Sequence, residues 1–105
     1  MSPQDLAIAQ TFKRLILQKV KIGRVLVFGS RSRGDATEES DLDLLVEIEE
    51  KKPGMRKWIS ECAWEAGFAA GVVIAPVVYT KDELTNHPGR FSCFVQKVLK
   101  EGISV

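Results

Sequence analysis

Two aspartates near the middle of the chain have the type and spacing of a metal-binding pair. Asp41 and Asp43 lie two residues apart at the start of an apolar run, so in an extended chain both carboxylates leave one face, about 6–7 Å apart. Because adjacent anions repel each other, the pair calls for a compensating cation, and oxygen ligands favour Mg²⁺. The alternative is a strand edge with two solvated aspartates, which alternation alone often produces.

A phosphate could bind where the preceding apolar run stops, at Gly29 and Ser30. Glycine has no side chain, so a phosphate can approach the backbone closely, and the Ser30 hydroxyl and the following N–H groups can bind its oxygens. Arg31 and Arg33 add positive charge beside this turn. Taken alone, a Gly-Ser pair after a strand is better explained as an ordinary turn.

The spacing of apolar residues predicts the elements that would position these side chains. They are, in order, a helix over residues 3–20, a strand over 24–28, a polar loop over 30–40 with one helical turn, a strand over 42–48, a helix over 55–69, a strand over 72–79, a helical turn over 81–84 and a helix over 90–101. This order of elements predicts an α+β fold, in which helices pack on a small mixed β-sheet.

Individual residues predict where several elements begin or end. Gly23 would end the first helix or the loop after it, and Gly102 would close the last helix. Pro76 cannot donate a ladder hydrogen bond, so its strand should lie at an edge or carry a bulge. Thr80 is a candidate cap for the short helical turn that follows it.

Length and composition narrow the class of protein. A chain of 105 residues with 45% hydrophobic content predicts a single domain over residues 1–105. Such a domain buries only about 60–70% of its unfolded surface, so a homodimer would be a reasonable way to gain stability. No apolar run is long enough for a membrane span, and we expect a cytoplasmic protein. The net charge of +1 argues against nucleic-acid binding through a general basic surface.

Side chains that could suggest other chemistry have structural explanations. Cys62 and Cys93 fall among apolar neighbours, as buried thiols do, and His87 lies in a predicted surface turn far from the aspartates. Helical spacing favours core or interface packing over base stacking for most of four aromatic residues: Trp58, Trp64, Phe91 and Phe94.

The two candidate features together are more specific than either alone. Gly29-Ser30, ten intervening residues and Asp41-x-Asp43, bracketed by two apolar strands, resemble the signature of the nucleotidyltransferase superfamily that includes DNA polymerase β and kanamycin nucleotidyltransferase. Further segments look like the minimal nucleotidyltransferases of prokaryotes: Arg33-Gly34, Ser40, the run from Leu42 to Val46, Ala75 to Leu84 and Lys100 to Ile103. The resemblance covers nearly the whole chain.

This resemblance implies a reaction and a role for each residue of the motif. The superfamily transfers a nucleoside monophosphate, here AMP, from a triphosphate to a hydroxyl and releases pyrophosphate. Gly29 and Ser30 would cradle the triphosphate of ATP, while Asp41 and Asp43 would be catalytic and hold Mg²⁺. Arg33 is a weaker candidate for a phosphate contact, since it could equally pair with an acid of its own loop.

One part of the superfamily's site is missing. Active members bring a third carboxylate from a later strand, and the position that we align with it is Val73. Glu47 lies about 13 Å from Asp43 along an extended strand, too far to share an ion. The alternative function is therefore a catalytically impaired antitoxin that binds nucleotide or partner without turnover.

The resemblance also implies a partner. Minimal nucleotidyltransferases are commonly encoded beside a small helical HEPN-type protein, in pairs that look like toxin–antitoxin modules in which the toxin is adenylylated. The chain is too short to carry a substrate domain, so we expect a macromolecular acceptor. A nucleic-acid-binding module that uses the basic N-terminal helix is a third alternative, which the near-neutral charge disfavours.

Overall fold

A mixed sheet forms the centre of the protein. The computed structural model describes residues 1–34, 36–37, 39–86 and 92–105, and its four-stranded sheet has the order β3-β2-β1-β4. The strands are β1 (Ile22–Phe28), β2 (Leu42–Ile48), β3 (Ile74–Thr80) and β4 (Ile103–Ser104). β1 pairs antiparallel with β2 and β4, and β2 pairs parallel with β3.

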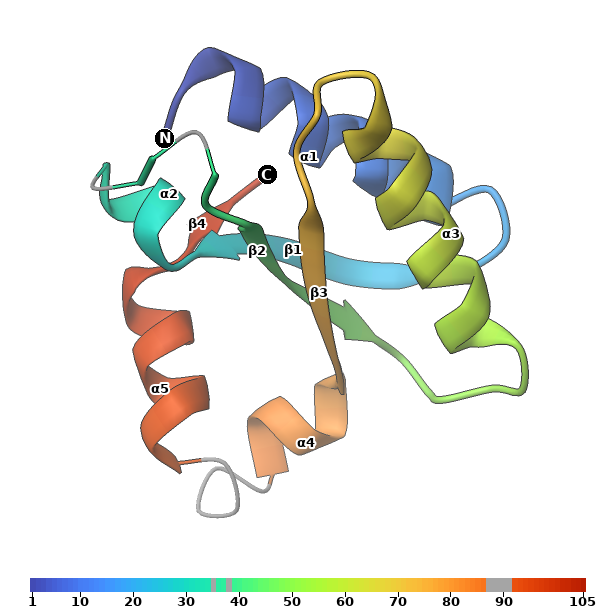
Figure 1. The fold of residues 1–105 in the computed structure, drawn as a ribbon. Helices are drawn as coiled ribbons and strands as arrows, with labels where there is room; N and C mark the ends of the chain where they lie inside the picture. The colour runs from blue at the N-terminus through green and yellow to red at the C-terminus, as the bar shows by residue number, and fades with distance from the viewer. Residues whose placement is uncertain (35, 38, 87–91) are drawn as a thin grey trace.

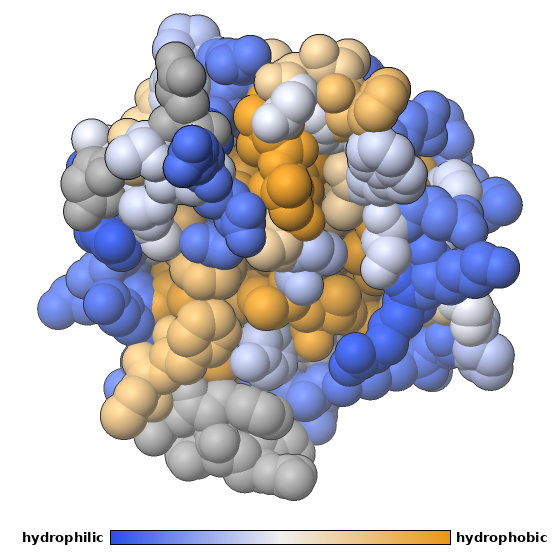
Figure 2. All heavy atoms as spheres, viewed as in Figure 1, coloured by the Kyte–Doolittle hydropathy of each residue, from blue (hydrophilic) through white to orange (hydrophobic). Residues whose placement is uncertain are grey.

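Helices cover both faces of this sheet, which confirms the predicted α+β fold (Figure 1). On one face lie α1 (Pro3–Ile16) and α3 (Met55–Phe68), and on the other lie α4 (Lys81–Asn86) and α5 (Ser92–Glu101). The short α2 (Ser30–Arg33) connects β1 to the loop before β2. Figure 2 shows hydrophobic residues gathered over the middle of the sheet, between hydrophilic surfaces on either side.

Alternation along β2 sends its side chains into two separate cores. Leu42, Leu44, Val46 and Ile48 pack with α1 and α3, whereas Leu45 packs on the opposite face with residues of α4 and α5. Successive side chains of a strand point to opposite faces, so Asp43 lies on the α5 face. Because β2 is buried on both sides, its register relative to β1 is strongly specified.

Several predicted boundaries are confirmed by the structure. β2 covers the predicted residues, β3 is an edge strand as Pro76 requires, and the predicted helical turn after Gly29 is α2. Thr80 caps α4, since its Oγ1 accepts from the Glu83 N–H at 3.0 Å and the Glu83 carboxylate accepts from the Thr80 N–H at 3.0 Å. These reciprocal bonds form a capping box.

Other expectations were wrong. The first helix ends at Ile16 rather than near residue 20. Gly23 lies within β1 at a register shift, rather than at the end of the helix or of the loop after it. β4 was not predicted, because two residues are too few to show a strand pattern and their extended form depends on pairing with β1. Cys93 is exposed, because α5 buries Val95 and Val98 instead; Cys62 is buried as predicted.

The aromatic residues only partly follow the prediction of packing. Trp58 is partly buried against the core, but Trp64 and Phe94 are 65% and 44% exposed. Phe91, His87 and the predicted start of the last helix at residue 90 lie outside the described residues. Within the described part of the chain, every helix is too short or too polar to cross a membrane.

Candidate active site

The turn between β1 and α2 has a backbone conformation that only glycine adopts readily. Gly29 has φ 79° and ψ −159°, a region essentially restricted to glycine. Its carbonyl accepts from the Arg33 N–H at 3.2 Å and from the Ser32 hydroxyl at 3.0 Å, which fixes the turn onto α2. The first N–H groups of a helix have no partner inside it, so the turn presents donors where a phosphate was predicted.

The carboxylate of Asp43 lies directly against this turn. Phe28 and Asp43 are register partners in the β1–β2 ladder, so the end of one strand faces the start of the other. A Cβ placed on Gly29 would overlap Oδ2 of Asp43 and would lie 3.3 Å from its Cγ. Glycine is therefore required here twice, by its positive φ and by the approach of the carboxylate.

The two aspartates interact electrostatically. Burial raises the pKa of the Asp43 carboxyl above its ordinary value of 3.8, the charge of nearby Asp41 raises this pKa further, and the charge of Arg33 lowers it. Asp41 is exposed, whereas Leu42 and Leu44 are fully buried on the other face. Two close anions of this kind fit a hard divalent cation, which would remove their repulsion.

Arg33 lies close enough for Asp43 to experience its charge. It is exposed on α2, and Ser30, at the start of the same helix, is partly buried. Arg33 could instead pair with an acid of its own loop, Asp35 or Glu38, and both of these lie outside the described residues.

The two positions beside the aspartates, one just before β3 and one within it, are apolar. Leu42 pairs with Ile74 and its N–H donates to the Val73 carbonyl at 2.9 Å, so Val73 lies alongside Asp41. Asp43 itself pairs with Ala75, a position that the sequence did not reveal because parallel register cannot be obtained from one sequence. Paired residues in adjacent strands share a face, with strands about 4.8 Å apart. Either position could carry a third carboxylate, and neither does.

Two further acids, one on β2 and one on α4, have structural partners. Glu47 accepts from the Arg24 guanidinium at 3.0 Å, and Glu83 caps α4 and pairs with Lys51 at 3.3 Å. In the described part of the chain, no three His, Cys, Asp or Glu side chains gather where they could hold a metal ion. The candidate site thus rests on a pair of carboxylates.

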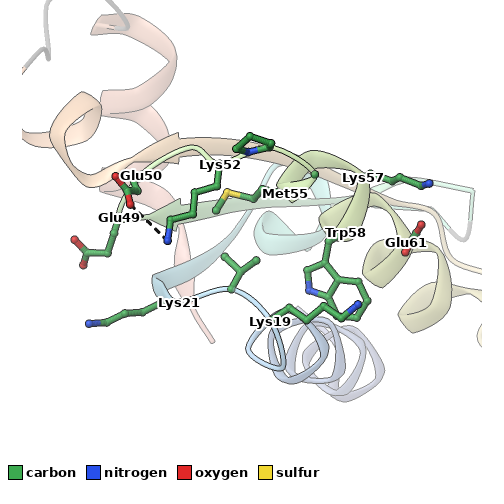
Figure 3. A pocket seen from close by; sticks show the side chains of 12 residues that line it. Lys19, Lys21, Glu49, Glu50, Lys52, Met55, Lys57, Trp58 and Glu61 are labelled. Atoms are coloured by element: carbon green, nitrogen blue, oxygen red, sulfur yellow. Dashed lines mark ion pairs between the residues drawn. The ribbon is translucent and has the colours of Figure 1, made fainter.

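A hollow of about 760 Å³ lies at the opposite end of the β1–β2 pair (Figure 3). Lysines and glutamates are mixed around it: Lys52 pairs with Glu50 at 3.5 Å, and the Lys19 ammonium lies 4.3 Å from the centre of the Trp58 ring. Its lining residues include neither aspartate, and its mixed charges do not converge on one ligand group. Size alone therefore does not make this hollow the active site.

Comparison with known proteins assigns the family. Residues 9–92 match the nucleotidyltransferase domain family, and the chain belongs to this family. A relative from Methanocaldococcus jannaschii, named "Putative protein adenylyltransferase", is 33% identical over 101 residues, covering 93% of this chain and 95% of its own. A second protein of that name from the same organism is 42% identical over 43 residues, covering 41% of this chain and 43% of its own.

A solved structure has the same fold. It is described as a crystal structure of "the toxin-antitoxin with AMP-PNP", and it aligns with a TM-score of 0.62 over 91% of this chain and 70% of the other chain. At 21% sequence identity, this likeness establishes the common fold.

We expect Gly29→Ala to disturb both the turn and the aspartate. Alanine at this position would have a strained backbone conformation, and its methyl group would collide with Asp43. The free energy of unfolding should therefore fall by about 3 kcal/mol in denaturant titrations. Gly54→Ala is the control, because Gly54 has φ 80° and no atom within 4 Å of an added Cβ. That control should lose only about 1 kcal/mol, and equal losses in the two variants would contradict the close approach.

We expect Asp43→Asn to stabilise the protein at pH 7 in the presence of EDTA. The pKa of Asp43 is higher in the folded protein than in the unfolded chain, where it is near 3.8, so the neutral carboxyl stabilises the fold at a pH below that value. This contribution is lost as the pH rises through the folded pKa and the carboxyl becomes charged. The rise in Tm over the native protein should therefore vanish near pH 3. Glu49→Gln, at an exposed acid, is the control, and a lower Tm for Asp43→Asn at pH 7 would contradict the electrostatic account.

Proposed function

We propose that the protein catalyses Mg²⁺-dependent transfer of AMP from ATP to a hydroxyl group of a partner protein. The observation that carries this proposal is the placement of the Asp43 carboxylate directly over the Gly29 turn. A phosphate chain bound by the backbone of that turn would lie beside two carboxylates, as metal-assisted phosphoryl chemistry requires. Membership of the nucleotidyltransferase domain family supports the same reaction class.

In this proposal each residue has a separate task. The amides at Gly29 and Ser30 and the Ser30 hydroxyl bind the triphosphate, and Asp41 and Asp43 hold Mg²⁺. When bound, the metal ion neutralises charge that develops on the phosphates. The acceptor oxygen forms a bond to the α-phosphorus, the bond to the pyrophosphate oxygen breaks, and the acceptor proton passes to a base or to solvent. Arg33, whose charge acts on Asp43, would add positive charge near the phosphates.

The proposed acceptor is a protein, specifically a small helical HEPN-type toxin that this chain would neutralise. Two relatives carry the name of protein adenylyltransferases, and a protein of the same fold is described as a toxin–antitoxin with AMP-PNP. A second candidate function is favoured by Val73 and Ala75, which leave the site without a third carboxylate. On that alternative the chain binds nucleotide or toxin without transferring AMP.

Incubation with ATP labelled at the α-phosphate, Mg²⁺ and the partner protein tests the proposal. Label should enter the partner only when Mg²⁺ is present, and Asp41→Asn should lower the rate at least about 100-fold, because it removes a metal ligand that also balances the phosphate charge. Glu49→Gln should transfer label at the native rate. Mg²⁺-dependent ATP binding with no label in any acceptor would reject the enzyme and leave the nucleotide-binding alternative.

Adding a carboxylate on β3 separates the two candidate functions. Ala75→Asp places an acid in register with Asp43, so we expect tighter Mg²⁺ binding and faster transfer than in the native protein. Val73→Asp is the matched control one step along the same face, beside the exposed Asp41, and should gain less. If neither variant changes Mg²⁺ affinity or transfer, a missing third carboxylate does not limit this site.

A further inference from the structure

Arg31, in the middle of α2, forms the most deeply buried ion pair among those that the structure describes. Its Nη1 lies 2.7 Å from Oδ1 of Asp5 in the first turn of α1, and the two side chains are only 9% and 6% exposed. By contrast, the side chains of the Arg24–Glu47 pair are 44% and 12% exposed. The sequence had suggested that Arg31 adds charge beside a phosphate, but its guanidinium is engaged with α1 instead.

The same guanidinium also binds the loop that carries the metal-binding candidates. Its Nε donates to the Ser40 carbonyl at 2.8 Å, one residue before Asp41. Ser40 is itself held in a turn, since its N–H donates to the Thr37 carbonyl at 3.1 Å and its Oγ accepts from the Thr37 N–H at 3.0 Å. One planar side chain therefore joins three segments: α1, the helix that follows Gly29, and the turn before Asp41.

Asp5 is a firm anchor for this arrangement. Its N–H donates to the Ser2 hydroxyl at 3.0 Å, in the N-cap of α1. The helix then continues into the core through Ala9 and Phe12, which are both fully buried. The ion pair thus ties α2, and through it the Ser40 backbone, to a helix that packs into the core.

Stability alone is a weak explanation for such a pair. Removing two charges from water costs about as much as their attraction returns, and a buried pair can often be replaced by apolar residues without loss. Arginine offers something that an apolar residue lacks, because its fixed fork of donors holds two acceptors in a defined geometry. That property suits a residue that positions other groups.

We propose that Arg31, held by Asp5, is a positioning residue that keeps the Gly29 turn and Asp41 at the spacing that Mg²⁺-ATP requires. This inference rests on the proposed function for its purpose. The two arginines of α2 then have different tasks. The buried Arg31 holds the backbone segments of the site together, while the exposed Arg33 lies within electrostatic reach of Asp43. Neither Arg31 nor Asp5 needs to touch the nucleotide.

Variants that keep or remove the charges test this role in the full chain. Asp5→Asn and Arg31→Lys should each weaken binding of Mg²⁺ with a non-hydrolysable ATP analogue by about 10–100-fold in calorimetry, as loss of supporting contacts does at metal sites. Without nucleotide, the amides of Arg33, Gly34 and Ser40, which donate to backbone carbonyls, should exchange hydrogen faster in both variants. Arg24→Met, which removes the Arg24–Glu47 ion pair, should change neither quantity.

The double variant Asp5→Leu/Arg31→Met separates positioning from stability. It removes both buried charges, so thermal stability should recover, but the contact to Ser40 remains absent and nucleotide affinity and amide protection should stay low. Recovery of affinity together with stability would overturn the proposal, as would unchanged amide exchange in Arg31→Lys, which stays informative if the double variant fails to fold. If the native protein fails to bind Mg²⁺-ATP, the proposed function falls, while amide exchange still decides whether Arg31 orders the loop.

Discussion

The contact between the Asp43 carboxylate and the backbone of Gly29 is the constraint around which this molecule is organised. A carboxylate can lie against the backbone of a turn only if the turn residue has no side chain. The register of the strands must also place the carboxylate beside that residue. Gly29 meets the first requirement, and the Phe28–Asp43 pairing meets the second. The repulsion between Asp41 and Asp43 is the cost of this arrangement, and a bound cation would remove it.

The surrounding fold holds this contact in place from two directions. Buried side chains of β1 and β2 pack on α1 and α3, so a one-residue slip of β2 would turn Asp43 and Glu47 toward that core and is strongly disfavoured. From the other direction, the Asp5–Arg31 pair ties α2 and the Ser40 backbone, on either side of the polar segment, to α1. The sequence of that segment is mostly polar, so it offers few apolar groups for packing.

The parts of this fold that depend on local pattern were predictable, and those that depend on long-range register were not. β2 and the turn at Gly29 follow from an apolar run and a glycine, and both were predicted from the sequence. The neighbour of Asp43 on β3 depends on how two strands align, so Val73 was chosen and Ala75 was missed. Similarly, Arg31 looks like a surface cation in the sequence, since nothing local shows that Asp5 lies 2.7 Å from it.

A crystal structure with Mg²⁺ and a non-hydrolysable ATP analogue tests the central claim most directly. The account predicts phosphate oxygens within hydrogen-bond distance of the amides at Gly29 and Ser30, and a metal ion ligated by both Asp41 and Asp43. Nucleotide bound in the lysine-lined hollow beside Trp58, at the other end of the β1–β2 pair, would contradict it. So would phosphates at the Gly29 turn with a metal ion that neither aspartate contacts.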